Sequence, residues 1–187
     1  MNRMSKLLLS FLVLSVCSVG AQGLTHIREI YRSVNAQIET CNSNSGESDN
    51  NCELYSNVLN INSQGNSWRA VGDYNKLTKF WYNDEPPFSE IESKPEAVLQ
   101  KIEVTISSTY NIYEEYLFEN GALIFYYHRY DYGEEIQEAR FYFKDGKLIE
   151  FISSVAEEAE PELERSDYAR VMEKGEALQV SFLESMK

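Results

Sequence analysis

Histidine and cysteine are scarce in this sequence of 187 residues, which contains 2 His and 3 Cys. A zinc site needs three or four ligands, usually His or Cys at close spacing, and His26 stands far from His128. A hydrolase triad needs a nucleophile on a sharp turn, and no GxSxG motif occurs. A glycine-rich phosphate loop is missing as well. We therefore expect a non-catalytic protein with no metal ion and no cofactor.

Basic residues are also few. The chain has 17 Lys and Arg against 30 Asp and Glu, a formal net charge of −13. Nucleic-acid binding depends on neutralising phosphates with Lys and Arg, so this charge argues against a nucleic-acid partner. Charged residues make up 25% of the chain and hydrophobic residues 43%, which is ordinary for a folded protein and argues against disorder.

The apolar run near the N-terminus is too short to span a bilayer, which takes about 20 residues. Residues 7–16 form this run of ten, after two basic residues and before small residues at 19–21. This order is typical of an export signal, so we expect residues 1–21 to be removed and one domain to cover residues 22–187. The protein would then be secreted or periplasmic, with no stable membrane insertion.

A lipoprotein signal is the alternative, with Cys17 as the lipidated residue. Such signals prefer Gly, Ala or Ser before the cysteine, and Val16 stands there, so cleavage near Ala21 is favoured. Cleavage would also remove Arg3 and Lys6, which leaves 15 basic against 30 acidic residues and a net charge of −15.

Two cysteines would remain after cleavage, Cys41 and Cys52, on either side of a polar segment at 42–51. In an exported chain such a pair indicates one disulfide bond. The acidic and amide residues between them do not follow the ligand spacing of an EF-hand, so we interpret the segment as a solvated loop.

Two segments have the apolar spacing of amphipathic helices, residues 23–40 near the N-terminus and 162–186 near the C-terminus. From about residue 67 to 153 the pattern is that of β-strands instead, with strands expected at 76–82 and 99–107.

Two hairpins give the strongest local signal. Asn120-Gly121 and Asp145-Gly146 are dipeptides that adopt the positive φ angles of a type I′ turn. The strands that they join are expected at 111–118 with 122–132, and at 136–144 with 147–153. Short sequential connections of this kind predict an α+β fold, in which an antiparallel meander of about five to seven strands packs with N- and C-terminal amphipathic helices.

Eight of the 13 tyrosines lie between residues 110 and 142, inside this meander. A two-residue turn at Asn120-Gly121 would pair Phe118 with Leu123 and Tyr116 with Phe125, an apolar face that we assign to the helices. The other face would then carry a candidate recognition surface formed by Tyr113, Glu115, Tyr126, His128, Tyr130 and Arg140. The same tyrosines could instead only stabilise a half-solvated sheet.

The favoured hypothesis is an exported, non-catalytic binding or interaction module with an acidic, tyrosine-rich sheet surface. Its negative charge would favour a cationic protein or peptide as partner. One alternative is a structural or accessory envelope protein that self-associates. Another is a glycan-binding or glycan-acting protein, because stacked aromatic residues and acidic pairs such as Glu114-Glu115 are present.

Overall fold

The computed structural model describes residues 3–43, 52–69, 72–85, 96–133, 135–155 and 161–187, and the side chains of its first helix from Gln22 onward. Its elements follow one another along the chain as α1 (Arg3–Ser43), β1 (Tyr55–Ile61), β2 (Ser67–Trp68), β3 (Gly72–Asp73), β4 (Asn75–Glu85), β5 (Glu96–Ser107), β6 (Asn111–Glu119), β7 (Ala122–Tyr132), β8 (Glu135–Lys144), β9 (Lys147–Ser153), a 3₁₀ turn (Arg165–Asp167) and α2 (Tyr168–Ser185). Most of the loop predicted at 42–51, and the side chains of the predicted export signal, lie outside this description.

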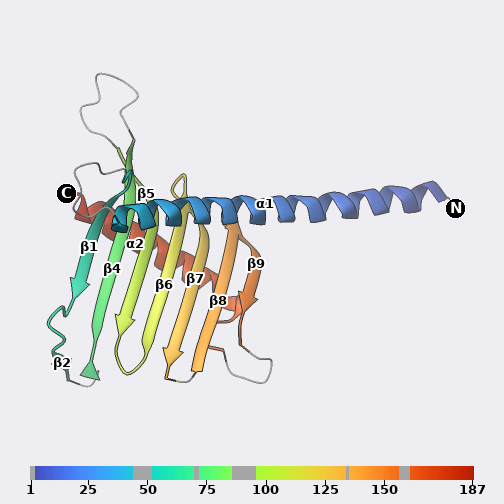
Figure 1. Cartoon of the computed structure of the whole chain (residues 1–187). Coiled ribbons are helices and arrows are strands. Elements are labelled where there is room, and N and C mark those ends of the chain that lie inside the picture. The colour runs from blue at the N-terminus through green and yellow to red at the C-terminus, as the bar shows by residue number, and fades with distance from the viewer. Residues whose placement is uncertain (1–2, 44–51, 70–71, 86–95, 134, 156–160) are drawn as a thin grey trace.

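Seven strands form one antiparallel sheet in the order β1-β4-β5-β6-β7-β8-β9, and β2 pairs with β3 beside it (Figure 1). The predicted α+β class, with a meander and two terminal helices, is confirmed. The sequence pattern missed β1, which pairs with β4 and forms one edge of the sheet. Among the described residues, no helix has the length and apolar character needed to cross a membrane.

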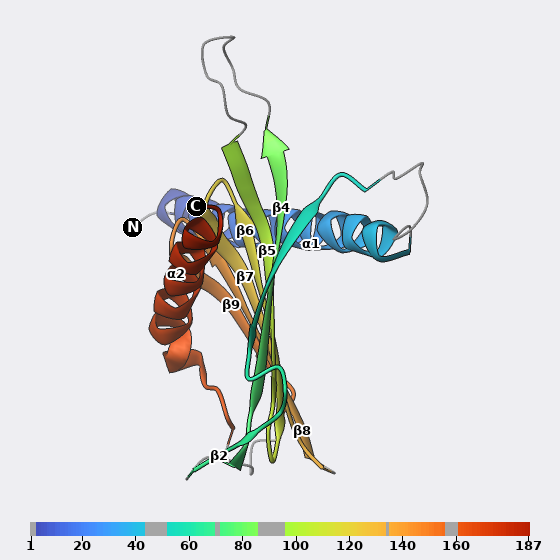
Figure 2. The same cartoon turned by 90° about the vertical axis from the view of Figure 1, so that its left-hand side faces the viewer.

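The two helices cover opposite faces of the sheet (Figure 2). α1 packs Ile27, Val34 and Ile38 onto one face, whereas α2 packs Val171 and Phe182 onto the other. The expectation that both helices share one face is therefore wrong. Seven strands present two broad faces, and each amphipathic helix buries its apolar stripe against a different one.

A glycine lets α2 approach the sheet closely. A Cβ atom at Gly175 would lie 3.1 Å from Cδ2 of Leu123 and 3.6 Å from Cδ1 of Tyr116. Both contacts are with the β6–β7 hairpin, so the helix axis lies directly over the tip half of that hairpin.

Both hairpin turns have the predicted conformation. Asn120 and Gly121 have φ angles of 50° and 75°, and Asp145 and Gly146 have φ angles of 51° and 70°. Positive φ at both central residues is the signature of a type I′ turn. The turn therefore sets the first cross-strand pairs, and Phe118 does pair with Leu123.

Beyond the first pairs, a β-bulge changes the register of the β6–β7 hairpin. Leu117 pairs with Phe125 and Phe118 with Leu123, so Ile124 is the extra residue. Ile124 and Phe125 both face α1 as a result, and Tyr116 pairs with Tyr126. The predicted pairing of Tyr116 with Phe125 is wrong, because an inserted residue reverses the faces of all residues after it.

The second hairpin has a bulge at the matching position. Tyr142 pairs with Glu150 and Phe143 with Leu148, so Ile149 is unpaired there. The two hairpins thus adopt the same type of turn and the same irregularity. The extra residue of each hairpin, Ile124 in the first and Ile149 in the second, packs with the core beneath α1.

The predicted disulfide between Cys41 and Cys52 is present. It joins the end of α1 to the segment that leads into β1, across a sequence separation of 11 residues. Leu54, which follows, is buried in the core beneath α1. A disulfide is consistent with an oxidising location outside the cytoplasm.

Candidate functional site

The six residues of the predicted recognition surface do not lie on one face. Tyr126, His128 and Tyr130 alternate along β7 on the α2 side, and Tyr126 is part of the core beneath α2. The other three, Tyr113, Glu115 and Arg140, lie on the α1 side, where they contact Tyr127 or residues of α1. The bulge at Ile124 causes this split, because it moves the β7 residues beyond it to the opposite face. The prediction of a single surface is therefore wrong.

Beneath α2, the carboxylate of Glu114 is the centre of a polar network. Glu114 is only 3% exposed, and Nζ of Lys174 lies 2.6 Å and 2.7 Å from its two oxygens. The hydroxyls of Tyr126 and Tyr116 donate to the same carboxylate at 2.9 Å and 3.3 Å. Nδ1 of His128 lies 3.8 Å from Oε1, too far for a direct hydrogen bond, and 3.2 Å from the Tyr126 hydroxyl. A buried charge with this many partners is well satisfied.

These partners keep Glu114 ionised. Burial by itself would raise its pKa, but His128, the Lys174 ammonium and the Tyr126 hydroxyl lower the pKa of Glu114 to about 2. The pKa of Tyr126 is raised in turn, by burial and by the negative charge of Glu114. The network thus ties α2 to β6 and β7 and is closed over by α2, so its part is structural.

A second polar network lies beneath α1, around Lys101. Lys101 is 1% exposed, and its Nζ lies 2.8 Å from Glu115, 3.1 Å from Glu103 and 2.7 Å from Oδ1 of Asn35. Tyr113 donates to Glu115 at 2.7 Å. Burial opposes the ionisation of Glu103, yet the Lys101 charge, with hydrogen bonds from neighbouring donors, brings its pKa below the ordinary value.

This second network fixes one residue of the cavity beside it. The hydroxyl of Tyr31, on α1, donates to Oε2 of Glu115 at 2.8 Å. Burial and the nearby Glu115 carboxylate raise the pKa of Tyr31. The ring of Tyr31 is therefore held in one orientation by a buried ion pair, and it packs edge-on against Phe125 with 5.1 Å between centroids.

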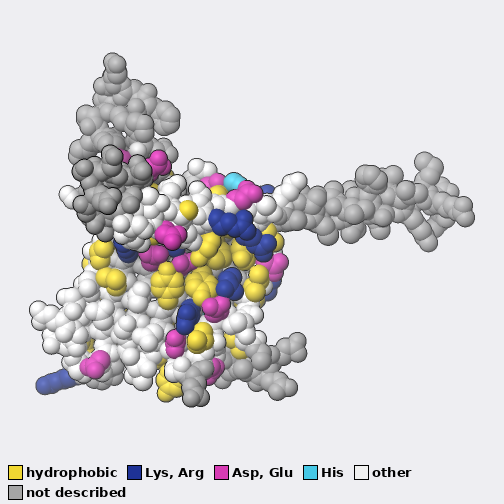
Figure 3. All heavy atoms as spheres, viewed as in Figure 1, with side chains coloured by type: hydrophobic (Ala, Val, Ile, Leu, Met, Phe, Trp, Pro, Cys, Tyr) yellow, Lys and Arg dark blue, Asp and Glu magenta, His cyan; other side chains and the backbone are white. Residues whose placement is uncertain are grey.

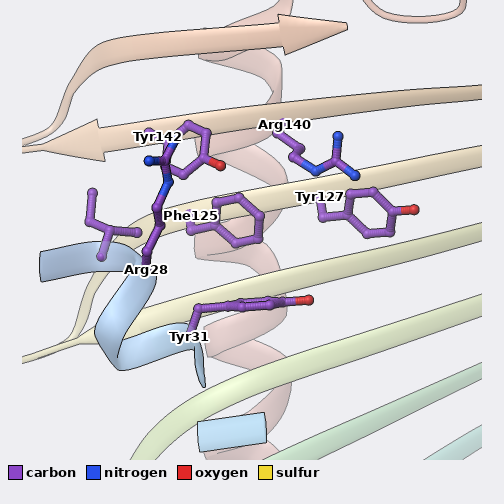
Figure 4. A pocket seen from close by; sticks show the side chains of 7 residues that line it. Arg28, Tyr31, Phe125, Tyr127, Arg140 and Tyr142 are labelled. Carbon is purple, nitrogen blue, oxygen red and sulfur yellow. The ribbon is translucent and has the colours of Figure 1, made fainter. Parts of the chain in front are cut away.

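The cavity is an aromatic pocket of about 320 Å³ between α1 and strands β7 and β8. Apolar side chains gather on this face of the molecule with Lys and Arg side chains beside them (Figure 3). We call it the arginine–tyrosine pocket, and it is lined by Ile27, Arg28, Tyr31, Phe125, Tyr127, Arg140 and Tyr142 (Figure 4). A volume of this size, with aromatic walls and a few polar groups, is at the lower end of the range for ligand sites.

Two arginines flank the pocket. The guanidinium of Arg28 lies over the ring of Tyr142 at 5.8 Å from the centroid, and that of Arg140 over Tyr127 at 5.2 Å. Arg140 also donates to Glu138 at 2.8 Å. Among the described residues, Arg28 has no carboxylate within ion-pair distance, which is notable in a chain with so many acidic residues. Of the two arginines that line the pocket, Arg28 is therefore the one available to an incoming anion.

The tyrosine hydroxyls of the pocket also differ in whether they have a hydrogen-bond partner. Tyr127 donates to Glu138 at 2.7 Å, and burial together with this hydrogen bond raises the pKa of Tyr127 to about 12. The hydroxyl of Tyr31 donates to Glu115. Tyr142 donates to no protein group within the described part of the chain. Arg28 and Tyr142 thus form the end of the pocket where polar donors are free.

Little of this pocket could be predicted from the sequence. Arg140 was among the predicted recognition residues, and Tyr31 lies within the helix predicted at residues 23–40. Phe125 comes to the pocket through the bulge at Ile124, which the sequence did not reveal, and Tyr142 lies beside it as its partner on β8. The sequence shows Arg28 and Arg140 in an acidic chain, but their spacing does not indicate that α1 and β8 lie together.

The described residues contain no group of three His, Cys, Asp or Glu side chains that could hold a metal ion. Comparisons of the chain with protein-family models, with curated proteins and with solved structures gave no match.

Proposed function

We propose that this protein is an exported, non-catalytic binding protein whose arginine–tyrosine pocket takes a planar organic anion. The observation that carries the proposal is the free guanidinium of Arg28 above Tyr142, at the mouth of a pocket with aromatic walls. A guanidinium with no carboxylate partner can bind a ligand carboxylate through two parallel hydrogen bonds. The disulfide supports the exported location.

The walls favour a flat ligand. Phe125 packs edge-on against Tyr31, and its ring centroid lies 5.0 Å from that of Tyr142, so three mutually packed aromatic rings line the pocket. Aromatic rings pack well against another ring in offset or edge-to-face geometry. An aromatic ring that bears one carboxylate therefore matches both the walls and the free donors.

The charge of the ligand should be small. The protein carries a net charge of −13, which repels anions at long range. In ordinary salt this repulsion is screened beyond about 10 Å, whereas a carboxylate about 4 Å from Arg28 would gain up to about 4 kcal/mol at an effective dielectric constant of about 20. Local attraction thus exceeds long-range repulsion for a single charge, and each further negative charge weakens that advantage.

No carboxylate of the two buried networks is free to act on such a ligand. Glu115 and Glu103 are bound to Lys101, and Glu114 is bound to Lys174 on the other face of the sheet. A general acid or base must reach the reacting group with its proton-accepting atom available. This supports binding without catalysis.

The test is a titration of the purified, oxidised protein with indole-3-carboxylate, followed by two-dimensional amide NMR. We expect shifts that cluster on α1 residues near Arg28 and on β7 and β8, and a much weaker response to indole-3-carboxamide. Arg28→Gln should weaken binding by roughly 10- to 100-fold, as the loss of a charge-assisted hydrogen bond does. Arg32→Gln is the matched control, because Arg32 is exposed on the same helix and does not line the pocket.

Equal responses to the carboxylate and the carboxamide would contradict the proposal, and so would an Arg28→Gln variant that binds as the wild type does. If neither compound binds at millimolar concentration, the pocket does not take planar aromatic anions.

A second candidate is binding of a cationic protein or peptide, and the observation that favours it is the excess of acidic residues, 30 against 17 basic. Steering of this kind depends on ionic strength. Binding of a lysine-rich peptide that is lost at high salt and unaffected by Arg28→Gln would support this candidate over the first.

A further inference from the structure

β1 is an edge of the seven-stranded sheet. It pairs with β4 on one side, and no strand of the described residues pairs with it on the other. Half of the backbone N–H and C=O groups of such a strand point outward and can accept another strand. Most of β1 is exposed along its length, with only Asn57 partly buried.

The edge lacks the usual protection against strand pairing. Tyr55–Ile61 contains no charged residue and no proline, the two devices that commonly block an edge. Its apolar side chains are open to solvent, with Tyr55 55%, Val58 57% and Leu59 47% exposed. β9, at the opposite edge, differs because it carries Lys147 and Glu150.

We propose that β1 pairs with β1 of a second copy of this chain, antiparallel, about a two-fold axis at Val58. This register places Tyr55 opposite Ile61 of the second copy, and Ser56 opposite its Asn60. Apolar residues thus meet apolar ones and polar residues meet polar ones at most positions, and the pair of an aromatic with a β-branched side chain is a favourable one.

Charge selects a second copy over a strand of a cationic partner. Chains of net charge −13 repel each other wherever their carboxylates meet. A neutral strand is a place where two such chains can touch without bringing carboxylates together, whereas a cationic strand would find no carboxylate to pair with on β1 itself. The neutral β1 edge is therefore suited to antiparallel pairing with β1 of a second copy.

The apolar strip also continues beyond the strand. The side-chain amide of Asn57 lies 3.2 Å from Sδ of Met186, which is 43% exposed after the end of α2. Leu183, one turn earlier, is 58% exposed. The second copy would therefore cover part of the α2 end as well as the strand.

Sedimentation equilibrium of the oxidised protein between about 1 μM and about 1 mM tests the proposal, a range that covers weak to moderate affinities. We expect the mass to rise toward twice that of the monomer. Val58→Lys should stay monomeric, because it places two ammonium groups opposite each other at the axis. Ile152→Lys is the matched control at the β9 edge, where Ile152 is 38% exposed, and it should dimerise like the wild type.

A strictly monomeric wild type over this range would overturn the proposal, as would dimerisation of Val58→Lys at wild-type strength. The near-ultraviolet circular dichroism of both variants shows whether each is folded, and both positions are exposed enough to accept lysine.

The register has its own test. Opposed residues of antiparallel strands have Cα atoms about 4.5–5.5 Å apart, within the range for a disulfide. Val58→Cys should therefore form a covalent dimer on mild oxidation, and Tyr55→Cys, which faces Ile61 of the second copy, should not. The reverse result would place the two-fold axis elsewhere and refute this register.

Discussion

Nζ of Lys174 lies 2.6 Å from Oε1 of Glu114, and this ion pair joins α2 to the centre of the sheet. The two partners differ in environment, because the carboxylate side chain is 4% exposed and the lysine side chain 42%. The sheet thus supplies a buried charge that only a correctly placed α2 can neutralise. α2 is attached by electrostatics as well as by the apolar contacts of Val171 and Phe182.

The first prediction concerns the acid stability that this pair provides. The pKa of Glu114 is lowered from 4.5 to about 2, so ionised Glu114 stabilises the fold above about pH 4.5, and the contribution is lost as the pH falls toward 2. The difference corresponds to about 3 kcal/mol. We expect Glu114→Gln to lower the free energy of unfolding by that amount at pH 7, and the gap to the wild type to close near pH 2.

Urea denaturation between pH 7 and pH 2 measures both the loss in Glu114→Gln at pH 7 and the closing of the gap at low pH. Glu39→Gln, which changes an exposed carboxylate on α1, is the control and should follow the wild type at every pH. A gap that stays constant between pH 7 and pH 2 would show that the loss comes from packing and not from the charge.

The second prediction concerns Lys101. Its ammonium lies 2.8 Å from Glu115 and 3.1 Å from Glu103, so Lys101→Met leaves two carboxylates in a partly buried site with no cation between them. Removing one partner of a buried ion pair costs about 3–5 kcal/mol, and we expect a loss of that size. The variant Lys101→Met/Glu115→Gln should recover part of it.

A double-mutant cycle measures this recovery. If the losses of Lys101→Met and Glu115→Gln simply add, the two side chains act independently, and the description of a shared network is incorrect.

Much of the secondary structure could be predicted because its determinants are local. Asn120-Gly121 and Asp145-Gly146 specify their turns through two backbone angles each, and helical spacing in 23–40 and 162–186 depends only on near neighbours. The disulfide followed from counting cysteines. β1 was missed because Tyr55–Ile61 has no regular alternation of apolar and polar residues.

The site could not be predicted because it depends on long-range packing. The bulge at Ile124 places both Ile124 and Phe125 beneath α1 and Tyr126 beneath α2, an arrangement that involves both helices. The sequence of the hairpin alone contains no local signal for this bulge. The pocket follows from this bulge, since Phe125 would otherwise face α2 and Arg28 would lie over a different wall.

The third prediction concerns the disulfide. Cys41 and Cys52 close a loop with a sequence separation of 11, which should stabilise the fold by about 3 kcal/mol through the entropy of the unfolded chain. Cys41→Ser/Cys52→Ser should therefore lower Tm by roughly 6–12 °C for a chain of this size. Reduction of the wild type should do the same, as thermal unfolding with and without reductant will show.

Hydrogen exchange adds a local readout. Because the bond anchors the end of α1, amides near Ile38 should exchange faster in the double variant, while those of α2 change little. Equal acceleration in both helices would mean that the disulfide stabilises the whole molecule without anchoring α1.

The last prediction concerns alkaline pH. Burial, followed by the negative charge of nearby glutamates, raises the pKa of Tyr113, Tyr116 and Tyr126 well above the ordinary value of 10. Each of these groups is therefore held neutral in the folded state, and it contributes stability below about pH 10 that is lost as the pH rises further.

Titration followed by the ultraviolet absorbance of tyrosinate should accordingly show two steps. The first, near the ordinary value of 10, is reversible and leaves the circular dichroism unchanged. The second comes at higher pH together with cooperative unfolding, because Tyr126 ionises only when the contact with Glu114 opens, and Tyr126→Phe should reduce that step alone. A single transition near pH 10 with the fold intact would mean that the two networks do not exclude water as their burial implies.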